Sequence, residues 1–104
     1  MLVYAHFTRD GSQYLQAFNK PERAVDYAYN QIYSYYTADE RHYSNPTYGK
    51  MPTELAAVKT ALDALKNGRT IEQIHKLIEA YEDYCRVIGQ ESPLHSIRDI
   101  PLVE

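Results

Sequence analysis

The chain has 104 residues, of which 44% are apolar, and its formal net charge is −3. A chain of this length builds one hydrophobic core, so we expect a single domain over residues 1–104. The acidic balance is unfavourable for a general nucleic-acid binder, which needs a basic face to displace counterions from phosphate. Cys85 is the only cysteine, which excludes an intramolecular disulfide and is typical of a reducing compartment.

The N-terminal residues give no targeting signal. Met1–His6 lacks the basic stretch and the longer apolar run of a secretory signal peptide. No apolar run in the chain approaches the roughly 20 residues that a transmembrane helix needs. We therefore expect a cytoplasmic protein without a membrane partner.

Two runs of β-branched and aromatic residues, 2–8 and 13–18, begin the chain on either side of Asp10-Gly11. Asp-Gly between such runs is a strong signal for a two-residue hairpin loop of type I′. The sequence therefore predicts a β-hairpin over about residues 2–18. This loop sets two pairs opposite each other on one face of the hairpin: Phe7 with Tyr14 and Val3 with Phe18.

A first helix is predicted over about residues 21–36. Asn19 is placed to cap it, Pro21 suits its first turn, and Glu22 can reach back to the cap. Apolar residues recur at helical spacing and predict one buried face: Val25, Ala28, Tyr29, Ile32 and Tyr36. Residues 37–51 contain Asn45-Pro46 and Gly49 and are interpreted as a long loop.

Two further helices are predicted, over about residues 53–66 and 71–88. Gly68 is expected to supply a left-handed residue between them, and Thr70 with Gln73 forms a capping box. So short a link makes the two helices an antiparallel αα-hairpin. The tail, residues 90–104, either adds a strand to the hairpin edge or lies across the helices. The sequence thus predicts an α+β fold, a β-hairpin packed on three α-helices.

Tyrosine is the most unusual feature of the composition, with eleven in the chain and seven of them between residues 27 and 48. One helix face cannot bury all seven, and Tyr is enriched where proteins contact each other. The alternative is a wide core face whose hydroxyls reach water at the rim. For the interface we select five contact residues: Tyr33, Tyr36, Arg41, Tyr43 and Tyr48.

The last helix carries more acidic than basic residues, which disfavours a DNA-reading helix-turn-helix. Its carboxylates suit a basic surface on a protein partner, for example one that normally binds nucleic acid. These partner-binding candidates are Glu72, Glu79, Glu82 and Asp83.

Chemistry-bearing patterns are sparse. Asp39-Glu40-Arg41-His42 has the residue types of an acid–base site, but a run of this kind is more often a solvated polar loop. With one cysteine and no paired histidines the sequence predicts no metal site, and with four glycines no phosphate-binding loop. We expect no cofactor, and we expect Cys85 to be a small buried hydrophobe rather than a nucleophile.

The chain is therefore interpreted as a small non-enzymatic protein-binding protein, an inhibitor or regulator that occludes a host macromolecular machine. It is similar in type, though not in sequence, to small phage or mobile-element proteins such as anti-CRISPR inhibitors. Two alternatives stay open: a nucleic-acid-associated module that stacks tyrosines on bases, and a small enzyme around His42. A homodimer formed through the apolar stripe of the last helix is also left open.

Overall fold

The computed structural model describes the backbone of residues 2–9, 12–66, 68–90 and 96–100, and the side chains of residues 17–66 and 68–90. The described part is mostly helical, and its elements follow the order β-β-α-α-α-β with a short 3₁₀ turn after the first helix. Their bounds are β1 Leu2–Arg9, β2 Ser12–Phe18, α1 Pro21–Tyr43, η1 Pro46–Tyr48, α2 Thr53–Ala64, α3 Ile71–Val87 and β3 Ser96–Ile100. None of the described helices has the length and apolarity that crossing a bilayer requires.

The three strands form one antiparallel sheet in the order β2-β1-β3. The β1–β2 register sets Phe7 opposite Tyr14 and Val3 opposite Phe18, the same pairs that the Asp-Gly position predicts. Asp10 and Gly11, and with them the expected turn type, lie outside the described residues. The tail was expected either to add a strand to the hairpin edge or to lie across the helices. Residues 96–100 form a strand that pairs with β1.

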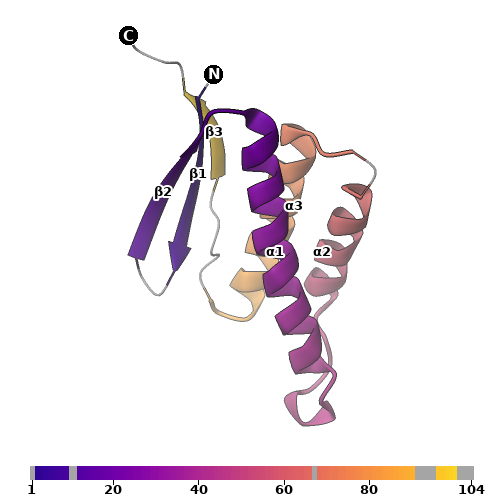
Figure 1. Ribbon diagram of the computed structural model, residues 1–104. Helices are drawn as coiled ribbons and strands as arrows, with labels where there is room; N and C mark the ends of the chain where they lie inside the picture. Colours follow the sequence, from indigo (N-terminus) through magenta and orange to yellow (C-terminus); the bar gives the residue numbers. More distant parts are fainter. Residues whose placement is uncertain (1, 10–11, 67, 91–95, 101–104) are drawn as a thin grey trace.

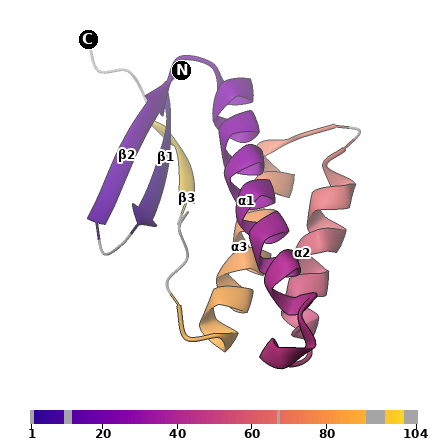
Figure 2. The same ribbon diagram turned by 60° about the horizontal axis from the view of Figure 1, so that its bottom comes forward.

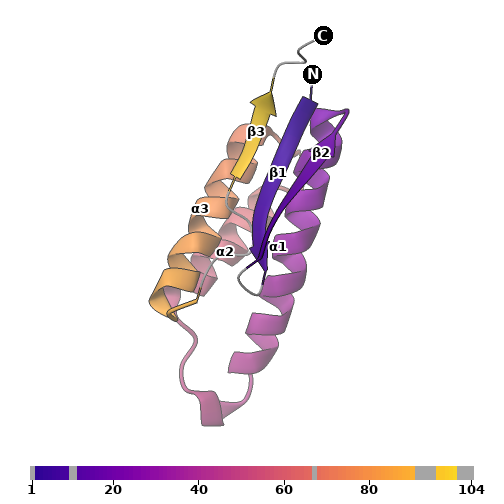
Figure 3. The same cartoon turned by 90° about the vertical axis from the view of Figure 1, so that its left-hand side faces the viewer.

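The sheet covers one side of a pair of helices, α1 and α3, and α2 lies on the other side of that pair (Figures 1 and 2). Seen from the sheet, β3 overlies α3 while β2 lies toward α1 (Figure 3). Helices α2 and α3 run antiparallel (Figure 1), which is the predicted αα-hairpin. The buried core is the meeting of the three helices: Ala24, Val25, Ala28, Tyr29, Ile32, Tyr36, Leu55, Val58, Leu62, Leu65, Ile74, Leu77, Ile78, Tyr81, Tyr84 and Cys85.

The predicted end of the first helix is wrong, because α1 continues seven residues past Tyr36, to Tyr43. Residues 37–43 contain no Gly or Pro that would stop a helix, and half-buried Asp39 and Tyr43 continue its inward face. The loop expected over 37–51 therefore begins only after Tyr43. The expected Asn19 cap is also wrong, since the N-cap is Lys20 and none of the described side chains caps the helix.

The turn between α2 and α3 corrects another expectation. Helix α2 ends at Ala64, and the next residue, buried Leu65, stays right-handed. The N–H of Leu65 donates to the carbonyl of Leu62 at 3.1 Å, so the last turn tightens without a left-handed residue. Gly68 accordingly has no positive φ.

Both ends of α3 follow from its sequence. Thr70 and Gln73 form the predicted capping box. At the other end Gly89 has φ +73°, its N–H donates to the Arg86 carbonyl, and the Gln90 N–H donates to the Cys85 carbonyl at 2.8 Å. These two bonds make a Schellman motif, in which glycine takes the left-handed position.

Candidate functional site

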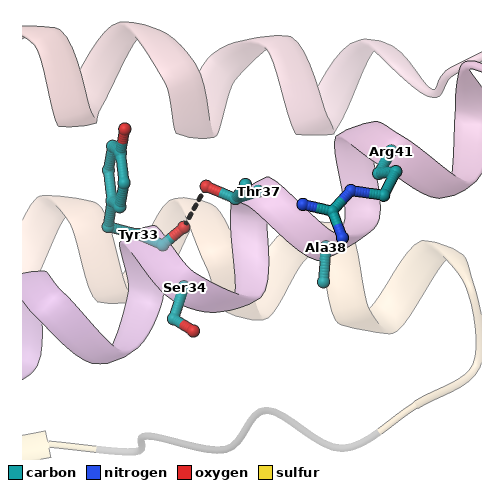
Figure 4. A pocket seen from close by; sticks show the side chains of 5 residues that line it. All are labelled: Tyr33, Ser34, Thr37, Ala38 and Arg41. Carbon is teal, nitrogen blue, oxygen red and sulfur yellow. Dashed lines mark hydrogen bonds between the residues drawn. The ribbon is translucent and has the colours of Figure 1, made fainter.

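A shallow open pocket of about 400 Å³ lies on the outer face of α1. Its lining residues, which we call the α1 surface, are Tyr33, Ser34, Thr37, Ala38 and Arg41 (Figure 4). They share one face because residues three and four apart are neighbours on a helix. The extension of α1 to Tyr43 is therefore what creates this surface, since Thr37, Ala38 and Arg41 all lie beyond the expected helix end.

Tyr33 forms one end of the α1 surface and is 51% exposed. Its ring stacks on Tyr29, with centroids 6.0 Å apart and planes at 22°. Tyr29 in turn contacts Arg69, whose guanidinium carbon lies 3.8 Å from the centroid of the Tyr29 ring. The same guanidinium forms an ion pair with Asp26 at 2.7 Å. This chain of contacts joins α1 to the segment before α3 and holds an exposed aromatic ring in a defined position.

Arg41 forms the other end of the α1 surface. Its side chain is exposed, and no carboxylate of the described residues lies within ion-pair distance of it. Between the two ends, the Thr37 hydroxyl donates to the Tyr33 carbonyl at 2.9 Å (Figure 4). The surface thus offers an aromatic ring and, two helical turns away, a guanidinium that forms no ion pair with the described carboxylates.

Tyr48 and Tyr43 lie past this surface, around His42. Tyr48, on η1, is 56% exposed and stacks on the His42 ring at 4.1 Å between centroids. Tyr43 meets the same imidazole edge-on at 5.0 Å and is half-buried. Asn45 Oδ1 accepts a hydrogen bond from the Thr47 N–H, which fixes η1 beside the helix end. Tyr48 is therefore a second exposed aromatic group, outside the α1 pocket.

Tyr36 does not belong to any exposed surface, so its selection as a contact residue is wrong. It is 7% exposed and lies in the core, and its hydroxyl donates to the Glu40 carboxylate. Burial, followed by the bond to Glu40, raises the pKa of Tyr36 to about 12. Its place on the buried stripe of α1, which the helical spacing also predicts, is the correct one.

The residues of the acid–base hypothesis do not converge on one point. Asp39 is half-buried and accepts a 2.8 Å hydrogen bond from the Tyr81 hydroxyl, Glu40 is bonded to Tyr36, and exposed His42 stacks on Tyr48. None of the three lines the α1 pocket. Each side chain thus has a separate structural contact.

Cys85 lies behind this region, on the buried face of α3. It is 3% exposed, and burial, assisted by the negative charge of Asp39, raises the pKa of its thiol to about 12. A thiol that stays protonated is a poor nucleophile. The expected role of Cys85 as a small buried hydrophobe is consistent with both observations.

The four acidic candidates of α3 differ in exposure and in their ion pairs. Glu72, Glu79 and Asp83 are exposed and Glu82 is half-buried. Asp83 pairs with Arg86 at 2.9 Å, which leaves Glu72 and Glu79 as the most accessible carboxylates of the set. None of the four lines the α1 pocket, so the structure does not bring them together with Tyr33 and Arg41.

No family model, curated protein or solved structure matches this chain. Across the described residues, no group of three or more His, Cys, Asp or Glu side chains is placed to hold a metal ion.

Sequence reasoning found the two ends of this surface and missed what lies between and beneath them. Ser34, Thr37 and Ala38 line the pocket, and their spacing from Tyr33 would have indicated them once the helix was known to continue. Asp26 and Arg69 support Tyr33 through Tyr29. No local pattern indicates that pair, because 43 residues separate its two members.

Proposed function

We propose that this chain is a non-enzymatic protein-binding protein whose principal contact is the α1 surface. The observation that carries the proposal is the side chain of Tyr33, which is half exposed and yet held by its stack on Tyr29. A large apolar ring left in water beside an open pocket gains free energy when a partner covers it.

The support of Tyr33 matters as much as its exposure. Binding usually costs the conformational entropy of the side chains that it orders. Because Tyr29 is itself fixed by Arg69 and Asp26, part of that ordering is present before the partner arrives. Rigid exposed tyrosines of this kind are typical of residues that dominate binding energy.

Arg41 supplies the polar part of the same contact. Because Arg41 pairs with no carboxylate in the described part of the chain, its guanidinium can bond a carboxylate of the partner through two parallel N–H groups. Tyr33 and Arg41 together favour a partner segment that carries an apolar group next to an acidic one.

Glu72 and Glu79 on α3 provide a second, electrostatic contribution. Exposed carboxylates on α3 steer a basic part of the partner surface toward that helix, more than they add to final affinity. A protein of this kind acts through the surface that it covers, and an inhibitor that occludes a host macromolecular machine, such as an anti-CRISPR protein, is the form of the proposal that the composition favours.

The test is affinity capture from a lysate of the natural host, with the whole chain as bait and mass spectrometry as readout. The binding variant is Tyr33→Ala with Arg41→Ala. The matched control, Lys59→Ala with Lys76→Ala, also removes two exposed side chains, from α2 and α3. Circular dichroism and thermal unfolding establish that all three proteins are folded.

We expect one host protein in near-stoichiometric amount with the wild type and the control, and at least about tenfold less with the binding variant, since hot-spot truncations cost 2 kcal/mol or more. Equal retention by all three proteins would contradict the assignment of the site. Nuclease-sensitive oligonucleotides in the eluate would instead favour the nucleic-acid alternative, and that binding would weaken steeply with salt.

A further inference from the structure

The two edges of the sheet, formed by β2 and β3, differ in their sequences, and this difference is separate from the α1 surface. Because the strand order is β2-β1-β3, β1 is paired on both sides, and each outer strand has one side that pairs with none of the described strands. An edge strand presents unpaired N–H and C=O groups, and proteins usually protect such an edge with charges, proline or a short strand.

The β3 edge carries these protections. It has five residues, contains Arg98 and Asp99, and is followed in the sequence by Pro101. Each of these features discourages another strand from pairing there. The β3 edge is therefore built to remain an end of the sheet.

The β2 edge carries none of them. Ser12–Phe18 is a strand of seven residues, Ser-Gln-Tyr-Leu-Gln-Ala-Phe, without a charge, a proline or a glycine. It lies at the margin of the sheet, with no other described strand along its outer side (Figures 2 and 3). The sequence of β3 therefore protects its edge against pairing with another strand, whereas the sequence of β2 leaves its edge open to such pairing.

The register shows which backbone groups are free. Ser12 pairs with Arg9 next to the two-residue connection, and the pair at that position of a hairpin exchanges hydrogen bonds. Bonded and non-bonded pairs then alternate along the ladder. The N–H and C=O groups of Gln13, Leu15 and Ala17 accordingly turn away from β1, toward the open edge.

We infer that the β2 edge pairs with the β2 edge of a second copy of this chain, antiparallel and centred on Leu15. That centre allows all seven residues of β2 to pair, with Gln13 opposite Ala17 of the second copy. The two-fold arrangement joins both sheets into one continuous sheet and pairs the backbone groups that each β2 edge leaves unpaired. An uncharged strand meets its own copy without like-charge repulsion, which favours self-pairing over a charged foreign strand.

The register of this dimer can be tested with charges. Gln13 and Ala17 lie on the same face of β2, two residues either side of Leu15. Gln13→Lys with Ala17→Lys sets lysine opposite lysine at both ends of the proposed contact, whereas Gln13→Glu with Ala17→Lys sets glutamate opposite lysine. Ser96→Lys with Ile100→Lys is the matched control, because it adds two lysines to that same face at the β3 edge.

Sedimentation equilibrium and native mass spectrometry of the full chain measure the outcome. We expect the wild type to have twice the chain mass of 12.1 kDa. The lysine pair should weaken dimerisation by about tenfold or more, while the glutamate–lysine pair and the β3 control keep the dimer. The glutamate–lysine variant shares the Ala17→Lys change, so its dimerisation separates repulsion from a failure to fold.

Three outcomes would overturn the inference. A wild type that stays monomeric at the highest soluble concentration excludes self-pairing. A dimer that the lysine pair leaves unchanged uses a different surface. A monomer that binds uncharged extended peptides, and loses them with the lysine pair, shows that the β2 edge accepts a foreign strand instead. None of these variants changes the α1 surface, so the result is independent of the proposed function.

Discussion

The hydroxyl of Tyr81 on α3 donates a 2.8 Å hydrogen bond to Asp39 Oδ2 on α1. Tyr81 is 4% exposed, and Asp39 is half-buried. The bond joins residues 42 positions apart in the sequence and ties the C-terminal part of α1, which sequence reasoning assigned to a loop, to the core. Burial is the main reason that the pKa of each of the two groups lies above its ordinary value.

The Tyr81→Phe variant should therefore be less stable than the wild type, by about 1–3 kcal/mol, because it leaves a half-buried carboxylate without its partner. Urea unfolding at pH 7, followed by circular dichroism, measures the difference. Tyr35→Phe is the matched control: the Tyr35 ring lies 6.1 Å from that of Tyr81, and its hydroxyl bonds to none of the described residues. That control should change stability by less than about 0.5 kcal/mol. Equal losses in the two variants would show that the bond contributes nothing.

The same carboxyl group predicts a dependence on pH. The raised pKa of Asp39 comes first from burial, while the Tyr81 bond and the charge of His42 act in the opposite direction without cancelling it. The folded state therefore holds this proton more tightly than the unfolded state does. Its contribution to stability is present below about pH 4 and is lost as the pH rises through the folded-state pKa.

The Asp39→Asn variant tests this sign, since asparagine stays neutral and still offers Tyr81 an oxygen acceptor. The free energy of unfolding of the variant, relative to wild type, should be greater at pH 7 than at pH 3.5. Urea unfolding of both proteins at the two pH values gives the comparison. A difference that does not change with pH, or that changes in the opposite direction, would contradict the raised pKa.

The helices show what a single sequence can predict. The stripe that contains Val25, Ile32 and Tyr36 repeats at helical spacing and is buried, and the capping box at Thr70 depends only on residues three apart. Such signals are local, so they require no knowledge of the rest of the fold. The hairpin register is similar, because a two-residue turn fixes every pair that follows it.

The end of α1 could not be predicted in the same way. Residues 37–43 are mostly polar, and the residues that continue the inward face there, Asp39 and Tyr43, are held by Tyr81 and Tyr84 on α3. Contacts with α3 thus support a part of α1 that the spacing of apolar residues alone does not indicate. The α1 surface was only partly predicted for this reason, since most of it lies on that segment.

Two tyrosines three residues apart distinguish core from surface on α1. Tyr36→Ala should destabilise the protein by about 3–5 kcal/mol, because it empties a buried site, whereas Tyr33→Ala should cost less than about 1 kcal/mol, since its ring is half exposed. Chemical denaturation of the two variants at pH 7 measures both values. A Tyr36→Ala protein as stable as Tyr33→Ala would mean that Tyr36 is not part of the core.

Gly89, which follows α3, and Gly68, which lies between α2 and α3, make a matched pair of glycines. Alanine substitutions at the two positions test the backbone conformation on either side of α3. A Cβ added at either position meets no heavy atom within 4 Å, so any difference between the two substitutions comes from the backbone. Gly89 has φ +73° and closes the Schellman motif, and the left-handed conformation costs an alanine about 1–2 kcal/mol. Gly68 has no positive φ, so alanine there restricts mainly the unfolded chain.

We therefore expect Gly89→Ala to lower the free energy of unfolding by about 1–2 kcal/mol and Gly68→Ala to leave it unchanged or raise it by up to about 1 kcal/mol. Thermal and urea unfolding of the two single variants, beside the wild type, provide the values. The opposite order would place the left-handed residue at Gly68, where sequence reasoning first expected it, and would require the α2–α3 turn to close differently from the right-handed path through Leu65.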